Sequence, residues 1–282
     1  MNSLVVLDPG PLTTVQDRGR LGWAHLGVPR AGALDEPAAA LANRLVGNVE
    51  TAAVLETTVG GVEVRVRDGC WAALTGADGA AYVDARPVGR HQPVWMPPDS
   101  VLRVGPAVQG VRTCVAFRGG IEVDPVLGSR STDTLAGVGP PVLRAGTELR
   151  IGRPTGVPQM LGAPAVRRRT AVLRLRRGPR ADWLAPGGWE SLLTSPWSVA
   201  ADSNRVGLRL SGPVLDRRAG EIPSEGMPLG AVQLPPSGQP VVLLADHPVT
   251  GGYPVVAVVD AADLWIAGQS APGETVRFTP GR

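Results

Sequence analysis

The sequence predicts an all-β protein, mainly strands with a few short helices, organised as two β-barrels. Gly and Pro supply 37 and 28 of the 282 residues, and breakers at that density leave little room for long helices. Short apolar runs recur between turn residues, and several of them alternate apolar with polar side chains. With 43% hydrophobic and 19% charged residues the composition is globular, and the length suits two domains.

The strands are expected wherever a short apolar or alternating run lies between turn residues. Val62–Val66 and Thr275–Phe278 show the period of two that a half-buried strand requires. Closing such short strands into barrels removes the sheet edges that they would otherwise expose. The expected strands are Leu4–Leu7, Val62–Val66, Trp71–Thr75, Val101–Val104, Arg112–Phe117, Glu148–Ile151, Ala171–Arg176, Val206–Leu210, Val241–Leu244, Val255–Val259 and Thr275–Phe278.

Helices are expected in three short segments. The clearest begins after Asp35, an N-cap residue, and ends at Gly47-Asn48, with apolar side chains spaced i, i+3, i+4, i+7. A second is expected from Ala261 to Gln269, capped by Asp260, and a third from Trp189 to Thr194. So few helices exclude Rossmann and TIM-barrel folds, which need a helix between successive strands.

A domain boundary is expected where Pro and Gly gather, at residues 153–164. The sequence therefore predicts an N-terminal barrel domain over residues 1–155, a linker over 156–168 and a C-terminal barrel domain over 169–282.

The composition excludes several function classes. All 28 positive residues are arginine, so the chain can hold no pyridoxal phosphate Schiff base, no GxxxxGK[ST] phosphate loop and no covalent biotin. The net charge of +3 is small, and the acidic residues are interspersed with the arginines, which argues against nucleic-acid binding. The Arg-rich run 167–180 alternates around Val172–Arg176 and predicts the outer face of a strand.

Metal binding and membrane insertion are also not expected. Cys70 and Cys114 stand in apolar runs and predict buried free thiols, while the three histidines lie far apart, so no zinc site is expected. No apolar stretch reaches the length of a membrane span, and the N-terminus lacks a signal-peptide pattern, so we expect a cytoplasmic protein.

Polar residues concentrate in the segment Thr13–Arg20. It combines hydroxyls, an amide, a carboxylate and two guanidiniums, a set that suits a small carboxylate or an acyl oxyanion. The alternative is a turn network that satisfies its own backbone. Asp35 similarly predicts a helix cap, although the same helix terminus would attract an anion if it were exposed in a cleft.

Further polar segments follow apolar strands, where sites on β scaffolds are common. They are Arg118–Ile121, whose glycine pair permits a close backbone approach, Leu127–Thr132, and the three runs 221–226, 230–236 and 246–254. His247 beside Asp246 is a possible acid–base position, but an exposed histidine is the commoner outcome. A hairpin turn and surface loops remain the alternative for these segments.

Several ordered motifs identify a family. The chain resembles the C component of 5-oxoprolinase, the KipA-like or allophanate hydrolase subunit 2 family, over nearly its whole length. Departures occur at Leu34, Val206 and Trp265 and in the run 248–250, and no role is carried over to His247. The motifs that carry the resemblance are Thr13–Arg20, Gly27–Asp35, Ala42–Asn48, Leu74–Asp78, Arg118–Ile121, Val126–Thr132, Asn204–Pro213, Ser224–Gly226, Gln233–Pro236 and Thr250–Pro254.

The resemblance implies tandem cyclophilin-like β-barrels and an enzyme subunit that is inactive without its partners. With a KipI-like B component and an A component, such a protein opens 5-oxo-L-proline to L-glutamate in an ATP-dependent lactam hydrolysis. Whether this chain itself binds ATP is left open. One alternative is a carboxyltransferase subunit that moves a carboxyl group from carboxybiotin, carried on another chain, to urea or another amide. The other alternative is a non-catalytic regulator that antagonises a KipI-like protein.

Both family reactions must activate an amide-like substrate while holding a small anion, and this chemistry suggests roles for the motif residues. We expect Arg18 and Arg20 to hold the anion, Glu225 to act as base and Tyr253 to donate a proton. Thr14 and Gln16 would act as donors to substrate oxygen. The remaining candidates for substrate binding, four of them through glycine backbone N–H groups, are Asp17, Asp35, Ser129, Arg130, Gly119, Gly120, Gly251 and Gly252.

Overall fold

The computed structural model describes residues 2–160, 162 and 171–281, and they form two compact units. The N-terminal unit contains residues 2–20, 31–133, 137–160 and 162. The C-terminal unit contains residues 21–30, 134–136 and 171–281. Neither unit is continuous in sequence, because residues 21–30 and 134–136 group with the C-terminal unit. Most of the expected linker, residues 161 and 163–168, lies outside the described residues.

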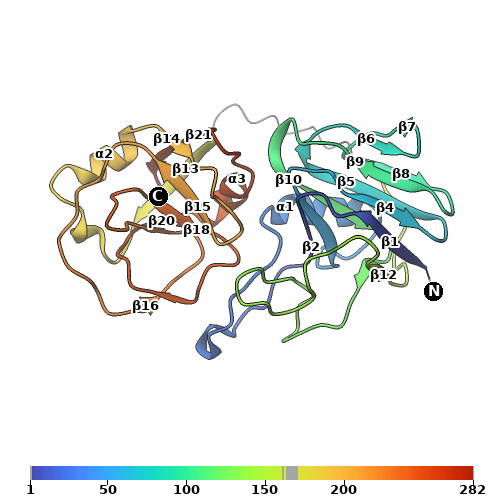
Figure 1. The fold of residues 1–282 in the computed structure, drawn as a ribbon, viewed down its shortest axis with the longest axis horizontal. Coiled ribbons are helices and arrows are strands. Elements are labelled where there is room, and N and C mark those ends of the chain that lie inside the picture. The colour runs from blue at the N-terminus through green and yellow to red at the C-terminus, as the bar shows by residue number, and fades with distance from the viewer. Residues whose placement is uncertain (1, 161, 163–170, 282) are drawn as a thin grey trace. The chain divides into compact units, whose positions relative to one another are not determined.

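Two antiparallel sheets build the N-terminal unit (Figure 1). Their facing side chains, among them Leu4, Leu55, Leu102 and Phe117, form one buried core. The seven-stranded sheet has the order β11 (Ile121–Glu122), β12 (Glu148–Ile151), β1 (Ser3–Asp8), β4 (Glu63–Val66), β9 (Val101–Val104), β6 (Ala81–Val83) and β7 (Arg86–Pro87). The five-stranded sheet has the order β2 (Leu12–Gln16), β3 (Val54–Thr58), β10 (Gln109–Phe117), β5 (Cys70–Asp78) and β8 (Pro93–Met96).

Helix α1 (Glu36–Leu45) covers the outer face of the five-stranded sheet. Its Ala42 and Leu45 pack with Ala73 and Ala116 in a second apolar cluster. The Asp35 carboxylate accepts a hydrogen bond of 2.9 Å from the Ala38 backbone N–H, which confirms the expected cap. The polar residue Thr75 anchors the same turn, because its hydroxyl donates to the Ala38 carbonyl at 2.7 Å.

The C-terminal unit is a closed seven-stranded barrel. Every pairing in it is antiparallel except that of β13 with β21, which is parallel. Around the barrel the strands are β13 (Ala171–Arg177), β20 (Val255–Val259), β17 (Ala231–Gln233), β18 (Val241–Leu243), β15 (Gly207–Ser211), β14 (Trp197–Val199) and β21 (Thr275–Pro280). A separate two-stranded ribbon joins β16 (Glu225–Gly226) to β19 (Thr250–Gly251).

The remaining helices are short. They are the 3-10 turns η1 (Ala24–Leu26), η2 (Ala181–Trp183) and η3 (Ala261–Asp263), and the α-helices α2 (Gly188–Thr194) and α3 (Leu264–Gly268). The expected helix over residues 261–269 therefore exists as η3 followed by α3. Its expected cap was wrong: among the described residues the Asp260 side chain makes no capping hydrogen bond to this helix, and it accepts instead from Arg176 Nε at 2.8 Å.

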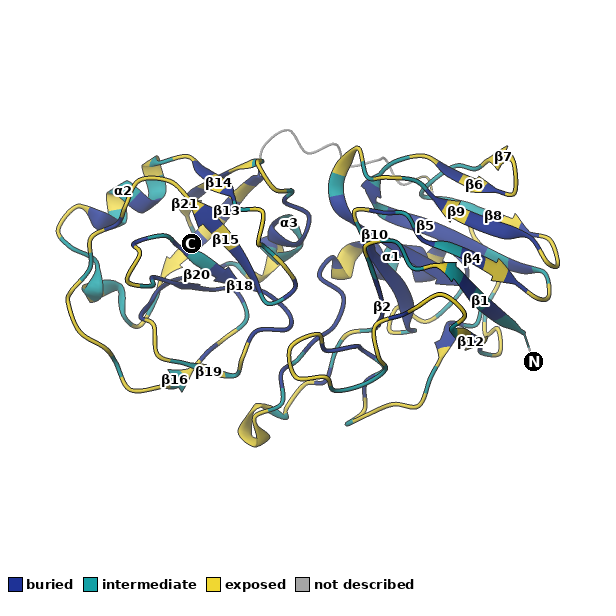
Figure 2. Ribbon diagram, in the orientation of Figure 1, coloured by how far each residue is buried: buried dark blue, intermediate teal, exposed yellow. Residues whose placement is uncertain are grey.

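The mainly-β prediction is confirmed, and each expected strand coincides with an observed one to within a few residues. Burial alternates along β13 as predicted, with Leu173 and Leu175 inside and Arg174 and Arg176 outside. Figure 2 shows the buried and exposed segments of both units. Arg167, Arg168 and Arg169 of the same run lie outside the described residues. No helix in the described ranges is long and apolar enough to span a membrane.

Candidate functional site

Asp17 is the centre of a hydrogen-bond network in the N-terminal unit. Its carboxylate accepts from the Ser129 and Ser131 hydroxyls at 2.6 Å each, from the Arg130 backbone N–H at 2.6 Å and from the Gly19 backbone N–H at 2.8 Å. These contacts join the end of β2 to a segment more than 100 residues further along the chain. The candidates Asp17, Ser129 and Arg130 therefore lie together. The Asp17 carboxylate, however, is engaged by donors from within the protein rather than by a ligand.

Arg20 extends the same network. Its side chain is only 2% exposed, and its guanidinium donates to the backbone carbonyl of Ser131. The expected role of Arg20 as an anion holder is not supported, because its guanidinium engages the Ser131 and Val126 carbonyls and so holds the 126–131 loop in place. The Arg130 side chain is used in the same way, with Nε donating to the Val123 carbonyl at 2.9 Å.

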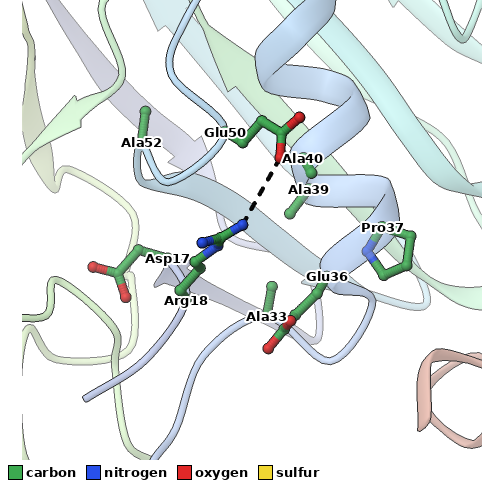
Figure 3. A pocket seen from close by; sticks show the side chains of 9 residues that line it. All are labelled: Asp17, Arg18, Ala33, Glu36, Pro37, Ala39, Ala40, Glu50 and Ala52. Carbon is green, nitrogen blue, oxygen red and sulfur yellow. Dashed lines mark ion pairs between the residues drawn. The ribbon is translucent and has the colours of Figure 1, made fainter. Parts of the chain in front are cut away.

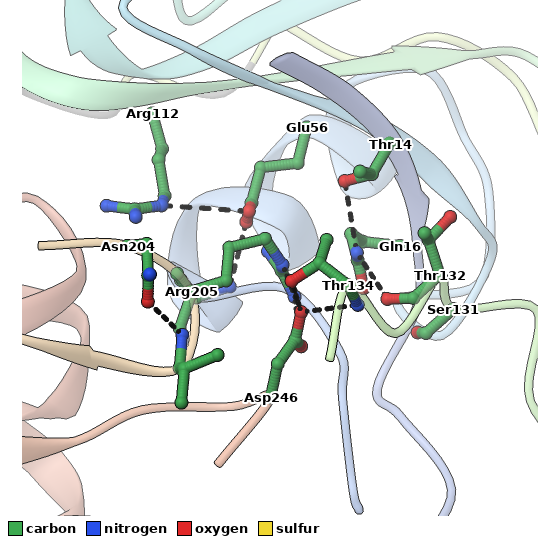
Figure 4. Close-up of polar contacts among 12 residues, drawn as sticks. Thr14, Gln16, Glu56, Arg112, Ser131, Thr132, Thr134, Asn204, Arg205 and Asp246 are labelled. Atoms are coloured by element: carbon green, nitrogen blue, oxygen red, sulfur yellow. Dashed lines mark hydrogen bonds and ion pairs between the residues drawn. The ribbon is translucent and has the colours of Figure 1, made fainter. Parts of the chain in front are cut away.

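Thr14 and Gln16 lie on one face of β2, and both side chains are buried. The Gln16 amide nitrogen donates to the Thr14 hydroxyl and to the Thr132 carbonyl, at 3.0 Å each (Figure 4). The residues Thr13–Gln16 belong to β2, the edge strand of the five-stranded sheet, which was not among the expected strands. Strand pairing with β3 satisfies the backbone of residues 12–16, whereas the expected turn network is present at Asp17, whose carboxylate accepts from the Gly19 backbone N–H.

A buried carboxylate lies in register with Thr14. Glu56 on β3 is 1% exposed, stands opposite Thr14 on one side and Cys114 on the other, and accepts from the Leu34 backbone N–H at 2.8 Å. Arg112 Nε lies 3.8 Å from its carboxylate. Neither Glu56 nor Arg112 was among the predicted site residues, although a charged residue inside the run Val54–Thr58 was the available signal.

Arg18 lines a pocket of about 220 Å³ beside α1 (Figure 3). Unlike Arg20, its side chain is 60% exposed, and its terminal nitrogen lies 3.8 Å from a Glu50 carboxylate oxygen. Glu36 and Asp17 also border the pocket, whose walls are otherwise small apolar side chains. The arginine is therefore in reach of a ligand, but it faces carboxylates as well as open space.

The glycine pair at 119 and 120 serves the fold. A Cβ atom on Gly119 would lie 2.0 Å from the Gly152 carbonyl oxygen, so only glycine permits this approach of the backbone. The two backbone N–H groups donate to Asn48 Oδ1 at 2.7 Å and to the Phe117 carbonyl at 2.8 Å. They are thus engaged inside the unit, which corrects the expectation that they bind substrate.

The candidates Glu225, Gly251, Gly252 and Tyr253 meet at the β16–β19 ribbon of the C-terminal unit. The Arg180 guanidinium binds the Glu225 carboxylate with both Nε and a terminal nitrogen, and this hydrogen bonding lowers the pKa of Glu225. A general base at neutral pH needs a raised pKa, so this environment suits an ion pair better than a base. Tyr253 is 45% exposed and adjoins the ribbon.

A second buried charge pair lies within the C-terminal unit. Asp246 accepts from Arg205 Nε at 2.9 Å and from a terminal Arg205 nitrogen at 3.0 Å (Figure 4). The Thr134 backbone and hydroxyl donate to the same carboxylate, at 2.9 and 2.6 Å. The neighbouring His247 is only 5% exposed, and its Nδ1 lies 2.8 Å from the Pro248 carbonyl, so the expectation of an exposed histidine was wrong.

Among the described residues, no group of three or more His, Cys, Asp or Glu side chains is placed to hold a metal ion. Cys70 and Cys114 are both buried free thiols, as predicted. Burial raises the pKa of Cys70 to about 12, which leaves the thiol protonated and unreactive at neutral pH.

Comparisons with known proteins place these features in a family. A model of the carboxyltransferase domain, subdomains A and B, matches residues 26–280. The chain is 36% identical to the 5-oxoprolinase C component of Escherichia coli K12, over 98% of this chain and 90% of the relative. It is 32% identical to urea amidolyase of Saccharomyces cerevisiae, over 96% of this chain but 16% of that protein. The crystal structure of K. lactis urea amidolyase superposes with a TM-score of 0.93 at 29% identity, covering 99% of this chain and 19% of the other.

Proposed function

Since the chain belongs to the carboxyltransferase-domain family, subdomains A and B, we propose that it is the C component of an ATP-dependent 5-oxoprolinase. In this role it works with the A component and a KipI-like B component to hydrolyse the lactam of 5-oxo-L-proline to L-glutamate. The protein would supply part of a site for a small lactam that carries one carboxylate.

One observation carries the proposal: this chain and the E. coli C component match along almost the whole of both proteins. By contrast, the match covers only 16–17% of the length of the urea amidolyases. A separate subunit needs partners to supply the rest of an active site.

ATP use is assigned to the assembled complex. The chain contains no lysine and so cannot form the phosphate loop that cradles nucleotide phosphates in many enzymes. A candidate contribution of this chain is to binding the organic substrate. Arg18 is an exposed cation at a pocket of about 220 Å³, a size compatible with a small acid. Gln16, two residues before it in the sequence, has a buried side-chain amide.

A second candidate function has independent support. The family model is that of a carboxyltransferase domain, and the fold matches a urea amidolyase closely. In that role the chain would help to transfer a carboxyl group from carboxybiotin to urea or another amide. Without a lysine it cannot carry biotin covalently, so a separate carrier chain would be required.

Reconstitution tests the two functions against each other. The chain is co-expressed with the A-component and KipI-like proteins of its own source, and the purified complex is assayed for glutamate formation from 5-oxoproline with ATP. We expect turnover by the complex and none by this chain alone. Avidin, which sequesters biotin, should leave the activity unchanged. Carboxylation of urea that avidin blocks, without glutamate formation, would favour the carboxyltransferase instead.

A further inference from the structure

The Gln16 amide has a defined orientation. Its nitrogen donates to the Thr132 backbone carbonyl at 3.0 Å, and a carbonyl oxygen can only accept. Exchanging the amide nitrogen and oxygen would bring two acceptors together, so the network assigns the nitrogen to the Thr132 side. The Thr14 hydroxyl accepts the second proton of the same nitrogen at 3.0 Å. Both amide protons are therefore used within the N-terminal unit.

The amide oxygen is in the opposite situation. Gln16 is fully buried, and among the described residues its Oε1 has no hydrogen-bond partner. A buried acceptor without a donor costs free energy, so native proteins keep few of them. The neighbouring Asp17 shows the contrast, because its carboxylate collects four donors from the same segments. Two hydrogen bonds of the amide nitrogen orient this side chain, and no donor for its oxygen stands within the part of the chain that the structure describes.

We propose that Gln16 Oε1 accepts a hydrogen bond from the N–H group of the amide or lactam substrate, an inference that rests on the proposed function. An amide oxygen can only accept, so it cannot bind the carboxylate or a developing oxyanion. The expected role of Gln16, donation to substrate oxygens, is thereby reversed, since its own donors are engaged. A lactam ring N–H is the donor that such an acceptor matches. Gln16 would then be the residue that distinguishes an amide from an ester.

Burial makes this contact selective. A site built to hydrogen-bond an N–H group rejects an analogue that lacks it, because the buried acceptor is then left without a donor. Replacing the ring N–H of 5-oxoproline by oxygen gives the lactone 5-oxotetrahydrofuran-2-carboxylate. This compound keeps the ring, the carbonyl and the carboxylate, but it presents a second acceptor to Gln16. Comparing the lactam with the lactone isolates the proposed contact.

The experiment uses the assembled complex with ATP and measures kcat/KM for the lactam and for the lactone. In Gln16→Met, a change of similar size, we expect kcat/KM for the lactam to fall by about tenfold or more and that for the lactone by less than about threefold. The ratio is taken within each preparation, so loss of folded protein cancels. Gln269→Met is the matched control, because Gln269 is also a buried glutamine, 4% exposed, but lies in the C-terminal unit. It should leave the ratio unchanged.

Binding by the wild-type complex provides a second measurement that needs no variant. Calorimetric titration without ATP should show tighter binding of the lactam than of the lactone, and equal dissociation constants would overturn the inference. An equal loss for both compounds in Gln16→Met would also overturn it, since a purely structural amide, or one satisfied by a buried water, affects both alike. A wild-type complex that turns over no 5-oxoproline would instead refute the proposed function, and the inference with it.

Discussion

Arg205 and Asp246 form a bidentate ion pair in the interior of the C-terminal unit, with exposed fractions of 1% and 0%. Burying two charges is costly, and here the cost is offset by four charge-assisted hydrogen bonds, two of them from Thr134. The pair fastens residues 134–136, which come from the first half of the sequence, to the loop after β18. It is therefore a structural link between distant parts of the chain.

Removing one partner of this pair should be severe. We expect Asp246→Ala to lower the free energy of unfolding by about 3–5 kcal/mol, because the buried Arg205 would lose the carboxylate that its Nε and a terminal nitrogen bind. Urea titration followed by circular dichroism measures the change. The surface pair of Asp202 with Arg209 is the control, with side chains 70% and 51% exposed, and Asp202→Ala should cost less than about 1 kcal/mol. Similar losses in the two variants would contradict a structural role for Asp246.

Arg18 should affect catalysis without affecting stability. In the assembled complex we expect Arg18→Ala to lower kcat/KM for 5-oxoproline by about 100-fold, the loss of one charge-assisted contact to the substrate carboxylate. Its exposed contact with Glu50 is long and contributes little to folding. Arg44→Ala is the matched control, since Arg44 pairs with the same Glu50 at 2.7 Å. If both variants keep normal kinetics and melting temperature, Arg18 does not bind the substrate.

Replacing Glu225, in contrast to Arg18, should have little effect on catalysis. Its ion pair with Arg180 lowers its pKa, so it stays ionised and weakly basic across the neutral range. We expect Glu225→Gln to change kcat/KM by less than about threefold and to leave the pH profile of the complex unchanged. A 100-fold loss together with the disappearance of the acidic limb of the profile would restore Glu225 as the catalytic base.

The pH dependence of stability should report on His91. Burial, and then the charge of Arg90, lower the pKa of this imidazole below its ordinary value of about 6.5. The unfolded chain therefore binds a proton more readily, so His91 contributes stability above pH 6.5 that is lost as the pH falls through the folded pKa. His91→Asn should flatten this loss, and asparagine tolerates the positive φ of 56° at this position. Urea midpoints from pH 4.5 to 8 measure the difference, and parallel curves would refute it.

The elements that local chemistry specifies could be predicted from the sequence. Alternation along Thr275–Phe278 and the Asp35 cap were sufficient to locate β21 and α1, because strand faces and helix starts depend on neighbouring residues. The family motifs likewise contained Asp17, Gln16 and residues 129–131, which the structure places in one region of hydrogen-bonded polar groups. The β2 strand was missed, because Thr13 and Thr14 are buried by distant residues rather than by a local apolar pattern.

The sequence by itself determined the fold class, the short helices and the family, since these follow from periodicity, capping and ordered motifs. Only the tertiary structure decided which candidates line a pocket and which are held inside the fold. Arg18 and Arg20 are two residues apart, yet one lines a pocket and the other is buried against Ser131. The same holds for the Gln16 amide, whose orientation depends on Thr132, 116 residues away. Hydrogen-bond partners are set by contacts between distant segments, and such contacts leave no local pattern in one sequence.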